Sequence, residues 1–436
     1  MSNLTNTTSN NIAMSAKNYA VLQCKITTNA GEEIELKELV HDVKINEKIY
    51  QSAMIVDIFI LDAINLMHEL KISGNESIHL IIGRIEPGDE AKGFDLKLHI
   101  SEIKDYSQPT PSSKAYTLQC VSKHVYLNNK KLLNRPFKNN ATRLITSIVR
   151  NDLKSEISTY SQNESKDIIQ GIFPNISPLQ AISWLLRNSY DNSTPIYFYE
   201  TAKDGIVINS YNQIINHFKE PYTIFNNFPF YKHSADDDKG AAVFDEEKRK
   251  IIKVMSQINL SKHRATLKGS FKSKLNKIDI STKTVTDNTY TYSNEKRMNA
   301  YAPITESMKI DDLSIATGFQ PARQHYLSLN ENAFSTKNYH APADNTILKA
   351  QASQHNLDTI RQEIVVAGDF ELTCGMIVEL ELIKNADITA EMINDDDFKD
   401  DVLSGNHLVT SVLHHFSKTG YTQNLVLKKD SFVKEV

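Results

Sequence analysis

Strict alternation of apolar and polar residues at both ends of the chain limits the folds that it can adopt. Residues 94–101 read Phe-Asp-Leu-Lys-Leu-His-Ile-Ser, and residues 378–382 read Val-Glu-Leu-Glu-Leu. A period of two places every apolar side chain on one face of an extended strand. Short strands of this kind, separated by glycine and proline turns, predict a small β-barrel at the N-terminal end, and the C-terminal end is predicted to be all-β as well.

The middle of the chain has the longer period of helices. Thr142 is the expected N-cap of a helix whose apolar residues recur at helical spacing. A second helix should begin at Pro178, because Ser177 is a good cap and Gln180 completes a capping box. Trp184, the only tryptophan, falls in this apolar helix and is expected to pack in the core rather than to serve as a ligand platform.

The predicted fold class is α+β, mainly β, with two similar small β-barrels, an α+β domain between them and an irregular insertion. A length of 436 residues suits about two to four domains. The predicted boundaries are a disordered N-terminal tail over 1–17, a first barrel over 18–127, a middle domain over 128–231, a second barrel over 232–292 and 341–436, and an insertion or arm over 293–340. The tail lacks the basic and apolar regions of a signal peptide.

Charge and cysteine usage exclude some classes of protein. The 49 basic and 53 acidic side chains give a net charge of -4, which argues against tight binding along a phosphate backbone. A channel through which nucleic acid slides is compatible with that balance. No stretch approaches the roughly 20 apolar residues of a membrane span. Cys24, Cys120 and Cys374 lie far apart in the sequence and are expected to be buried, reduced thiols.

No local motif selects a catalytic, metal or cofactor site, and none is predicted. His414 and His415 are adjacent, with His407 upstream, but neighbouring strand residues point to opposite faces and cannot readily share one ion. The aspartate run over 395–397 lacks the spacing of a calcium loop and indicates a solvated loop. A carboxylate pair for glycoside hydrolysis stays open, because its two members need not be close in sequence.

Ordered turns and strands at the two ends carry a resemblance to a known family. At the N-terminal end these are the segments 31–36, 43–50, 57–66 and 72–78, the last containing Gly74 and Glu76. At the C-terminal end they are 365–378 with Gly368 and Gly375, 403–409 with Gly405, and the closing hairpin 412–416 that returns at Tyr421. The chain thereby resembles the baseplate hub proteins of T-even-like contractile phages, whose hub domains also occur in the VgrG spikes of type VI secretion.

The resemblance implies a structural protein of the virion and not an enzyme. It implies a homotrimer whose six small barrels form a ring, which adapts the six-fold tail tube to the three-fold spike and lets genomic DNA pass without specific binding. The implied partners are the tail spike or tail lysozyme protein, tail tube or tube-initiator proteins and baseplate wedge proteins. The implied location is the tail baseplate, assembled in the host cytoplasm. We expect a neutral to acidic lumen from the net charge.

Two other functions are kept as alternatives. One is a tail-associated cell-wall hydrolase, an activity that the resemblance assigns to the spike partner. The other is a receptor-binding or glycan-binding tail protein, which calls for exposed aromatic clusters. Tyr290, Tyr292 and Tyr301 offer only a sparse cluster, for which packing in a strand or an interface is the favoured interpretation.

Overall fold

A computed structural model gives the fold. It describes residues 15–69, 72, 74, 76–87, 90–111, 113–160, 168–187, 190–191, 194–217, 222–225, 239–254, 267–279, 283–291, 298–299, 309–310, 313–314, 323–328, 340–358, 360–384 and 399–433. Strands dominate these residues, so the predicted class, α+β and mainly β, is confirmed. Among the described helices, none is long and apolar enough to cross a membrane.

The N-terminal part of the chain forms an antiparallel β module around one apolar core. Its strands pair in the order β3-β4-β7-β6-β5-β1-β2. Alternation decides which side chains are inside, as predicted, since Leu96, Leu98 and Ile100 are all buried. The elements are β1 (Ala20–Thr27), β2 (Glu33–Glu35), β3 (Val40–Lys48), β4 (Ile55–Asp62), α1 (Leu66–Glu69), β5 (Ser77–Glu86), β6 (Glu90–Thr110) and β7 (Ser113–Ser122).

The C-terminal part forms a second β module, whose apolar core also takes in side chains from residues 197–214. Its strands pair in the order β15-β21-β24-β23, and β22 lies between β23 and the parallel strand β14. The helix α6 packs against β21. The elements are β14 (Tyr222–Phe225), α6 (Lys239–Arg249), β15 (Ile251–Val254), β21 (Ile360–Ala367), β22 (Ile377–Glu381), β23 (Gly405–Ser417) and β24 (Gly420–Lys429).

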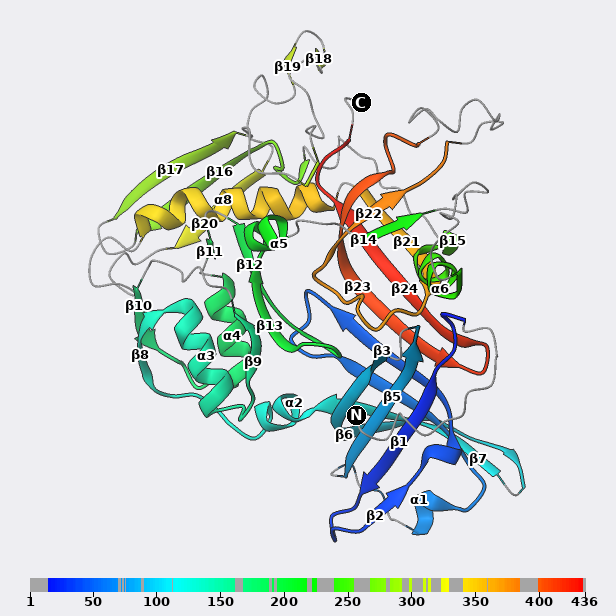
Figure 1. The fold of residues 1–436 in the computed structure, drawn as a ribbon. Coiled ribbons are helices and arrows are strands. Elements are labelled where there is room, and N and C mark those ends of the chain that lie inside the picture. Colours follow the sequence, from blue (N-terminus) through cyan, green and yellow to red (C-terminus); the bar gives the residue numbers. More distant parts are fainter. Residues whose placement is uncertain are drawn as a thin grey trace, which may run out of the picture.

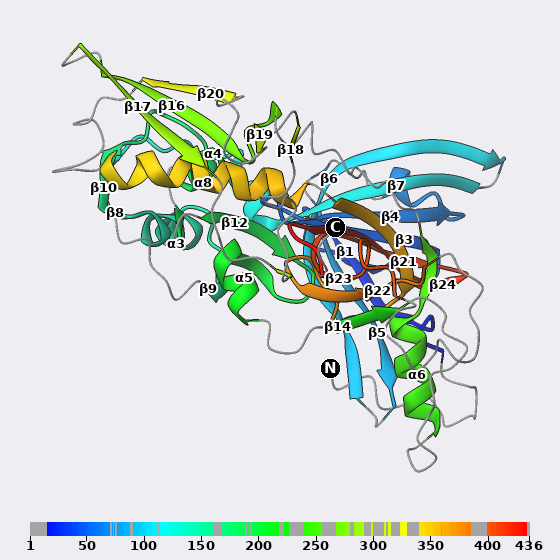
Figure 2. The same cartoon turned by 90° about the horizontal axis from the view of Figure 1, so that it is seen from above.

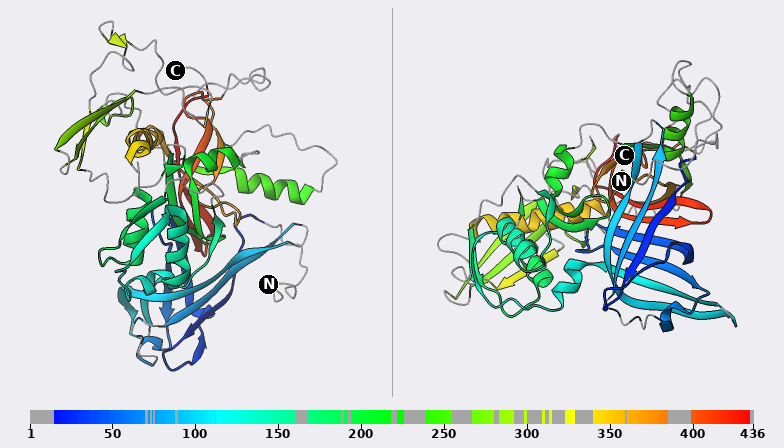
Figure 3. Two further views of the ribbon diagram at one scale, coloured as in Figure 1. Left: turned by 90° about the vertical axis from the view of Figure 1, so that its left-hand side faces the viewer. Right: turned by 60° about the horizontal axis from the view of Figure 1, so that its bottom comes forward.

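The two β modules share one continuous sheet. The strand β23 of the second module pairs antiparallel with β3 of the first, so hydrogen bonding runs on from one module into the other. Blue and red strands, from the two ends of the chain, therefore lie side by side in Figure 1. The hairpin of β6 and β7 extends beyond the rest of the sheet, as Figures 2 and 3 show.

The middle domain places two helices between two small sheets, beside the main sheet (Figure 1). One small sheet pairs β8 with β10, and the other has the order β11-β12-β13-β9. Side chains of both sheets and of α3 and α4 form a single apolar core. The elements are α2 (Lys123–Asn128), β8 (Pro136–Asn140), α3 (Ala141–Asn151), β9 (Ile157–Tyr160), β10 (Ile168–Ile172), α4 (Pro178–Arg187), β11 (Tyr190–Asp191), β12 (Thr194–Thr201), β13 (Gly205–Ser210) and α5 (Tyr211–His217).

Of the two helix starts predicted in this domain, that of α4 is confirmed and that of α3 is wrong. Helix α4 begins at Pro178, and the Ser177 backbone N–H donates to Gln180 Oε1 at 3.1 Å, as the capping box requires. The predicted cap of α3 is wrong. Asn140, at the end of β8, has extended backbone and accepts from the Arg143 N–H at 2.8 Å, so Thr142 lies inside the first turn.

A separate small sheet departs from the predicted boundaries. Strands β16 (Lys272–Asp279) and β17 (Thr284–Thr291) were expected in the second barrel, but they pair with each other and with β20 (Arg323–Ser328), which comes from the expected insertion. Helix α8 (His340–Leu357) covers this sheet, and Leu275, Tyr290 and Leu348 share its core. The short strands β18 (Lys309–Ile310) and β19 (Leu313–Ser314) pair with each other. Strand β14 likewise joins the main sheet instead of the middle domain.

The expected N-terminal tail is too long by at least three residues. Ala16 is fully buried, and its N–H donates to Glu247 Oε2 at 2.8 Å, while its carbonyl accepts from Arg84. The carbonyl of Lys17 accepts from the Tyr421 N–H at 2.7 Å. Residues 15–17 therefore bridge both β modules, through partners that lie far away in sequence.

Candidate functional site

The junction between β3 and β23 determines how the two β modules sit relative to each other. Six consecutive residue pairs align, from Ser411 opposite Lys48 to Phe416 opposite Val43. The Ser411 hydroxyl also donates to the Glu47 carbonyl at 3.0 Å. Both strands alternate, so every second side chain of each strand points into the same buried region.

Glu47 is the charged residue at the centre of that region, and it is fully buried. Its Oε1 accepts from the Ala202 N–H at 2.6 Å, and its Oε2 accepts from the Cys374 N–H at 3.2 Å. His414 Nε2 lies 3.3 Å from Oε1. One carboxylate thus ties the first module to the end of β12 and to the second module, because a buried charge needs such partners to be stable.

A second layer of polar contacts surrounds His414. Its Nδ1 lies 2.9 Å from the Tyr421 hydroxyl and 3.1 Å from Gln423 Nε2. Gln423 Nε2 also donates to the carbonyls of Asp369 and Leu372, at 2.8 and 3.0 Å. Burial raises the pKa of the Tyr421 hydroxyl, so it stays a neutral donor. The turn after β21 is thereby fixed to the hairpin of β23 and β24.

Charged groups on α6 and β5 extend the network across the outside of the junction. Arg84 and Glu86 form a buried pair at 2.6 Å, and Lys248 of α6 lies 3.3 Å from Glu86 and 3.5 Å from Asp369. Asp369 also accepts from the Tyr222 hydroxyl at 2.8 Å. Burial raises the pKa of that hydroxyl. These contacts fasten α6 to the first module through Glu86, and they fasten both α6 and β14 to Asp369 in the turn after β21.

Three of the positions singled out in the sequence, Gly368, Gly375 and Tyr421, lie at this junction. A Cβ on Gly368 would lie 2.0 Å from Tyr421 Cδ1, so the tyrosine ring fills the space that a side chain would need. Gly375 has φ of +86° and lies against the Tyr199 hydroxyl, where a Cβ would be 2.1 Å away. Both glycines therefore permit close approach of an aromatic ring to the backbone.

The other singled-out positions serve turns elsewhere. Gly405 has φ of +106° and lies beside Asn299, whose side-chain amide donates to the Asn406 carbonyl at 3.0 Å. Gly74, with φ of +92°, donates its N–H to Glu76 Oε2 at 2.8 Å, away from the junction. Gly405 and Gly74 allow backbone conformations with positive φ, and neither lies beside Gly368 or Tyr421.

The polar residues of the junction are shielded from large molecules. Glu47 and His414 are each fully buried, and Glu200, whose pKa is raised by burial, is 5% exposed. A polymer cannot reach such groups without opening the sheet. Within the described part of the chain, no three histidine, cysteine or acidic side chains cluster as metal ligands would.

Other candidate residues have ordinary surroundings. His415 lies 2.7 Å from Asp42, on the opposite face of the strand from His414, as predicted. His407 is buried and packs against Gln362. Tyr290 packs under α8, whereas Tyr292, Tyr301 and the aspartate run at 395–397 lie outside the described residues. Cys24, Cys120 and Cys374 are free and buried, as predicted.

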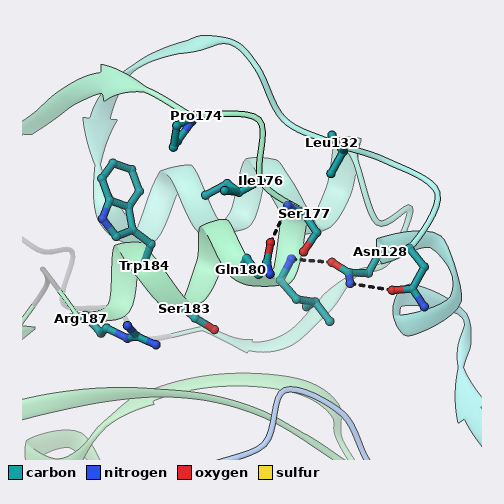
Figure 4. A pocket seen from close by; sticks show the side chains of 11 residues that line it. Asn128, Leu132, Pro174, Ile176, Ser177, Gln180, Ser183, Trp184 and Arg187 are labelled. Carbon is teal, nitrogen blue, oxygen red and sulfur yellow. Dashed lines mark hydrogen bonds between the residues drawn. The ribbon is translucent and has the colours of Figure 1, made fainter.

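A pocket opens on the middle domain, between α4 and the loop after α2 (Figure 4). Its volume is about 770 Å³, and none of its lining residues is acidic. Trp184 stands at one end and Asn128 at the other. Edge-on contacts of Trp184 with Phe137 and Phe173 tie it to the core as predicted, and it also lines the pocket.

Sequence reasoning missed Glu47 and Arg84, although a signal was present. In β3 the inward positions are Val43, Ile45 and then Glu47, so the period of two alone places a carboxylate inside. His414 follows Val412 in the same way on β23. A charged residue at an inward strand position predicts a buried polar partner.

The fold has known relatives among solved structures, although no protein-family model and no curated protein matches the sequence. The 43 kDa tail protein of prophage MuSo2 from Shewanella oneidensis matches with a TM-score of 0.53 and 12% identity, over 94% of this chain and 99% of that one. A tail protein from Neisseria meningitidis MC58 matches with a TM-score of 0.50 and 12% identity, over 94% and 97%. This chain has the fold of phage tail proteins. The likeness spans nearly the whole of each chain, so the phage tail protein fold includes the β modules, their junction and the middle domain.

Proposed function

We propose that the chain is a structural subunit of the central hub of a contractile-tail baseplate. In this proposal three copies form a ring that adapts the six-fold tail tube to the three-fold spike and lets DNA pass. The observation that carries the proposal is the continuous sheet through β3 and β23, in a chain with the fold of phage tail proteins. Each subunit thereby offers two β modules in fixed relation, as a ring with twice as many modules as subunits requires.

The proposed partners follow from the same assembly. They are two further copies of the chain, the spike or tail lysozyme protein, tail tube or tube-initiator proteins and baseplate wedge proteins. The site of action is the virion tail, after assembly in the host cytoplasm. The buried junction supports a structural role over the hydrolase alternative, because its acidic residues have no path to a polymer.

The state of association tests the proposal directly. Size-exclusion chromatography with light scattering, on the chain alone and with its spike protein, should give a mass near 148 kDa for the hub, three times the 49.4 kDa of one chain. A stable monomer at micromolar concentration in both samples would contradict the ring. Clearing of purified peptidoglycan by the isolated chain would favour the hydrolase instead.

The ring also carries an electrostatic expectation. A net charge of -4 per chain gives a trimer with a net charge of -12, and a neutral to acidic lumen would let DNA slide without binding. Cryo-electron microscopy of the trimer would show which side chains line the lumen. A strongly basic lumen would contradict this part of the proposal.

A further inference from the structure

The middle domain is a basic island in an acidic chain. Residues 123–217, from α2 to α5, carry 11 lysines and arginines against 7 acidic side chains, a net charge of +4, so the rest of the chain carries -8. Asp152 is buried and already pairs with both Lys131 and Arg135. Lys138 is exposed in the middle of β8. A surface with this excess attracts acidic groups at short range.

The outer face of the same domain exposes large aliphatic side chains. Pro136 on β8 lies opposite Ile172 on β10, and Asn140 lies opposite Ile168, with Lys138 between them. Ile172 and Ile168 are 64% and 58% exposed, and Leu132, just before β8, is 59% exposed. Branched aliphatic side chains gathered on one face mark a surface that another protein covers.

The pocket beside this face has the composition of a binding surface. Leu132 belongs to both, and Trp184 and Arg187 line the pocket. Tryptophan and arginine are the residue types that most often dominate protein interfaces. The absence of acidic groups from the lining keeps the pocket compatible with an acidic partner.

We propose that this outer face, formed by β8, β10 and the pocket beside α4, binds an acidic and partly apolar segment of another tail protein. The inference rests on the proposed hub function for its setting. Strands β8 and β10 lie at the far end of the molecule from the main sheet (Figures 1 and 2). If the main sheets of three copies form the central ring, this face of each copy points outward, toward other proteins of the baseplate.

A protein partner fits the face better than nucleic acid does. Binding to a phosphate backbone depends on unpaired cations and gains little from exposed isoleucines. Here two of the cations are engaged by Asp152, while the isoleucines offer apolar area that a polypeptide can bury. The expected partner segment therefore combines aspartate or glutamate with apolar residues.

Zero-length cross-linking in intact phage particles tests the inference. A carbodiimide joins an ammonium group to an accessible carboxylate in direct contact, and Lys274 with the exposed Asp287, at 2.6 Å, provides an internal control within the chain. We expect Lys138 to be joined to an acidic residue of a different tail protein. Joining of Lys138 only to a second copy of this chain, or only within the chain, would overturn the inference. Absence of the chain from the particles would refute the hub proposal itself, and this inference with it.

A matched pair of variants separates binding from folding. Ile172→Ser removes an exposed aliphatic side chain from the face, and Ile64→Ser removes one of similar exposure, 61%, from the first β module. In particles that carry each variant, we expect about a tenfold lower yield of the Lys138 cross-link for Ile172→Ser and no change for Ile64→Ser. Equal yields for both variants, or salt-sensitive binding of DNA duplex by the purified chain that Lys138→Glu abolishes, would overturn the inference.

Discussion

Replacement of Glu47 by alanine tests whether the buried polar junction holds the two β modules together. The change removes the acceptor of two backbone N–H groups, those of Ala202 and Cys374, and the acidic neighbour of His414. An unsatisfied buried donor costs about 1–3 kcal/mol. The bond to Cys374 is buried and that to Ala202 only partly, so we expect a loss of about 2–4 kcal/mol in the free energy of unfolding. That is a large fraction of the roughly 5–15 kcal/mol that keeps a domain folded.

Urea unfolding followed by far-ultraviolet circular dichroism measures this loss, because strands of the two modules dominate the signal. Fluorescence of Trp184, the only tryptophan, reports separately on the middle domain. Glu47→Gln keeps one acceptor oxygen and should lose about half as much, on the same estimate of about 1–3 kcal/mol per donor.

The control is Glu33→Ala, which removes an exposed carboxylate from a surface pair with Lys25. Such a change costs about 0.5 kcal/mol or less. If Glu47→Ala moved the dichroism midpoint no further than Glu33→Ala, the junction would not depend on the carboxylate and the reasoning would be refuted.

Three further experiments, two substitutions and one labelling reaction, test other buried groups of the protein. Gly368→Ala drives a methyl group into the buried Tyr421 ring and should lower stability by about 1–3 kcal/mol in thermal unfolding; a loss below about 0.5 kcal/mol, as for an ordinary surface change, would argue against the ring contact. Burial lowers the pKa of Lys429 from 10.5 to about 7, so the folded state binds fewer protons than the unfolded state between these values and stability falls as pH drops from 10 to 7. Lys429→Met should flatten that slope, and an unchanged slope would contradict the assignment. The buried thiols, among them Cys374 with its raised pKa, should react with a disulfide reagent only on unfolding, so rapid labelling of native protein would be a contrary result.

Local patterns predicted the parts of the fold that depend on local rules. Alternation over 94–101 placed the right side chains inside, and the Ser177 capping box located the start of α4. The misplaced parts depend on contacts between distant residues. The hydroxyl of Ser15 donates to Glu247, 232 positions away. Strand β14 pairs with β22, although the strands β16, β17 and β20 lie between them in the sequence. No local periodicity records such pairings, because either partner alone has many possible neighbours.

The candidate site was predictable to a similar degree. Gly368 and Tyr421 were selected separately, as motif positions of the family resemblance, and in the structure the Tyr421 ring fills the space that a Cβ on residue 368 would need. Glu47 was readable as an inward charge, whereas its partners Ala202 and Cys374 were not, because both donate from the backbone. Every residue except proline has a backbone N–H, so the residue type does not reveal which residue will donate.

The chemistry of the junction explains what a strand pair with a polar core adds to the contact between the two β modules. An apolar contact alone can slide, because burial is non-directional. A slip of β23 by one residue against β3 would turn His414 away from Glu47 and bring His415 inward. Glu47 would then stay buried without that neighbour, and low dielectric surroundings penalise a buried polar group that loses a partner. The polar core therefore fixes one register among several, and a ring assembled from such subunits would inherit a single spacing between its modules.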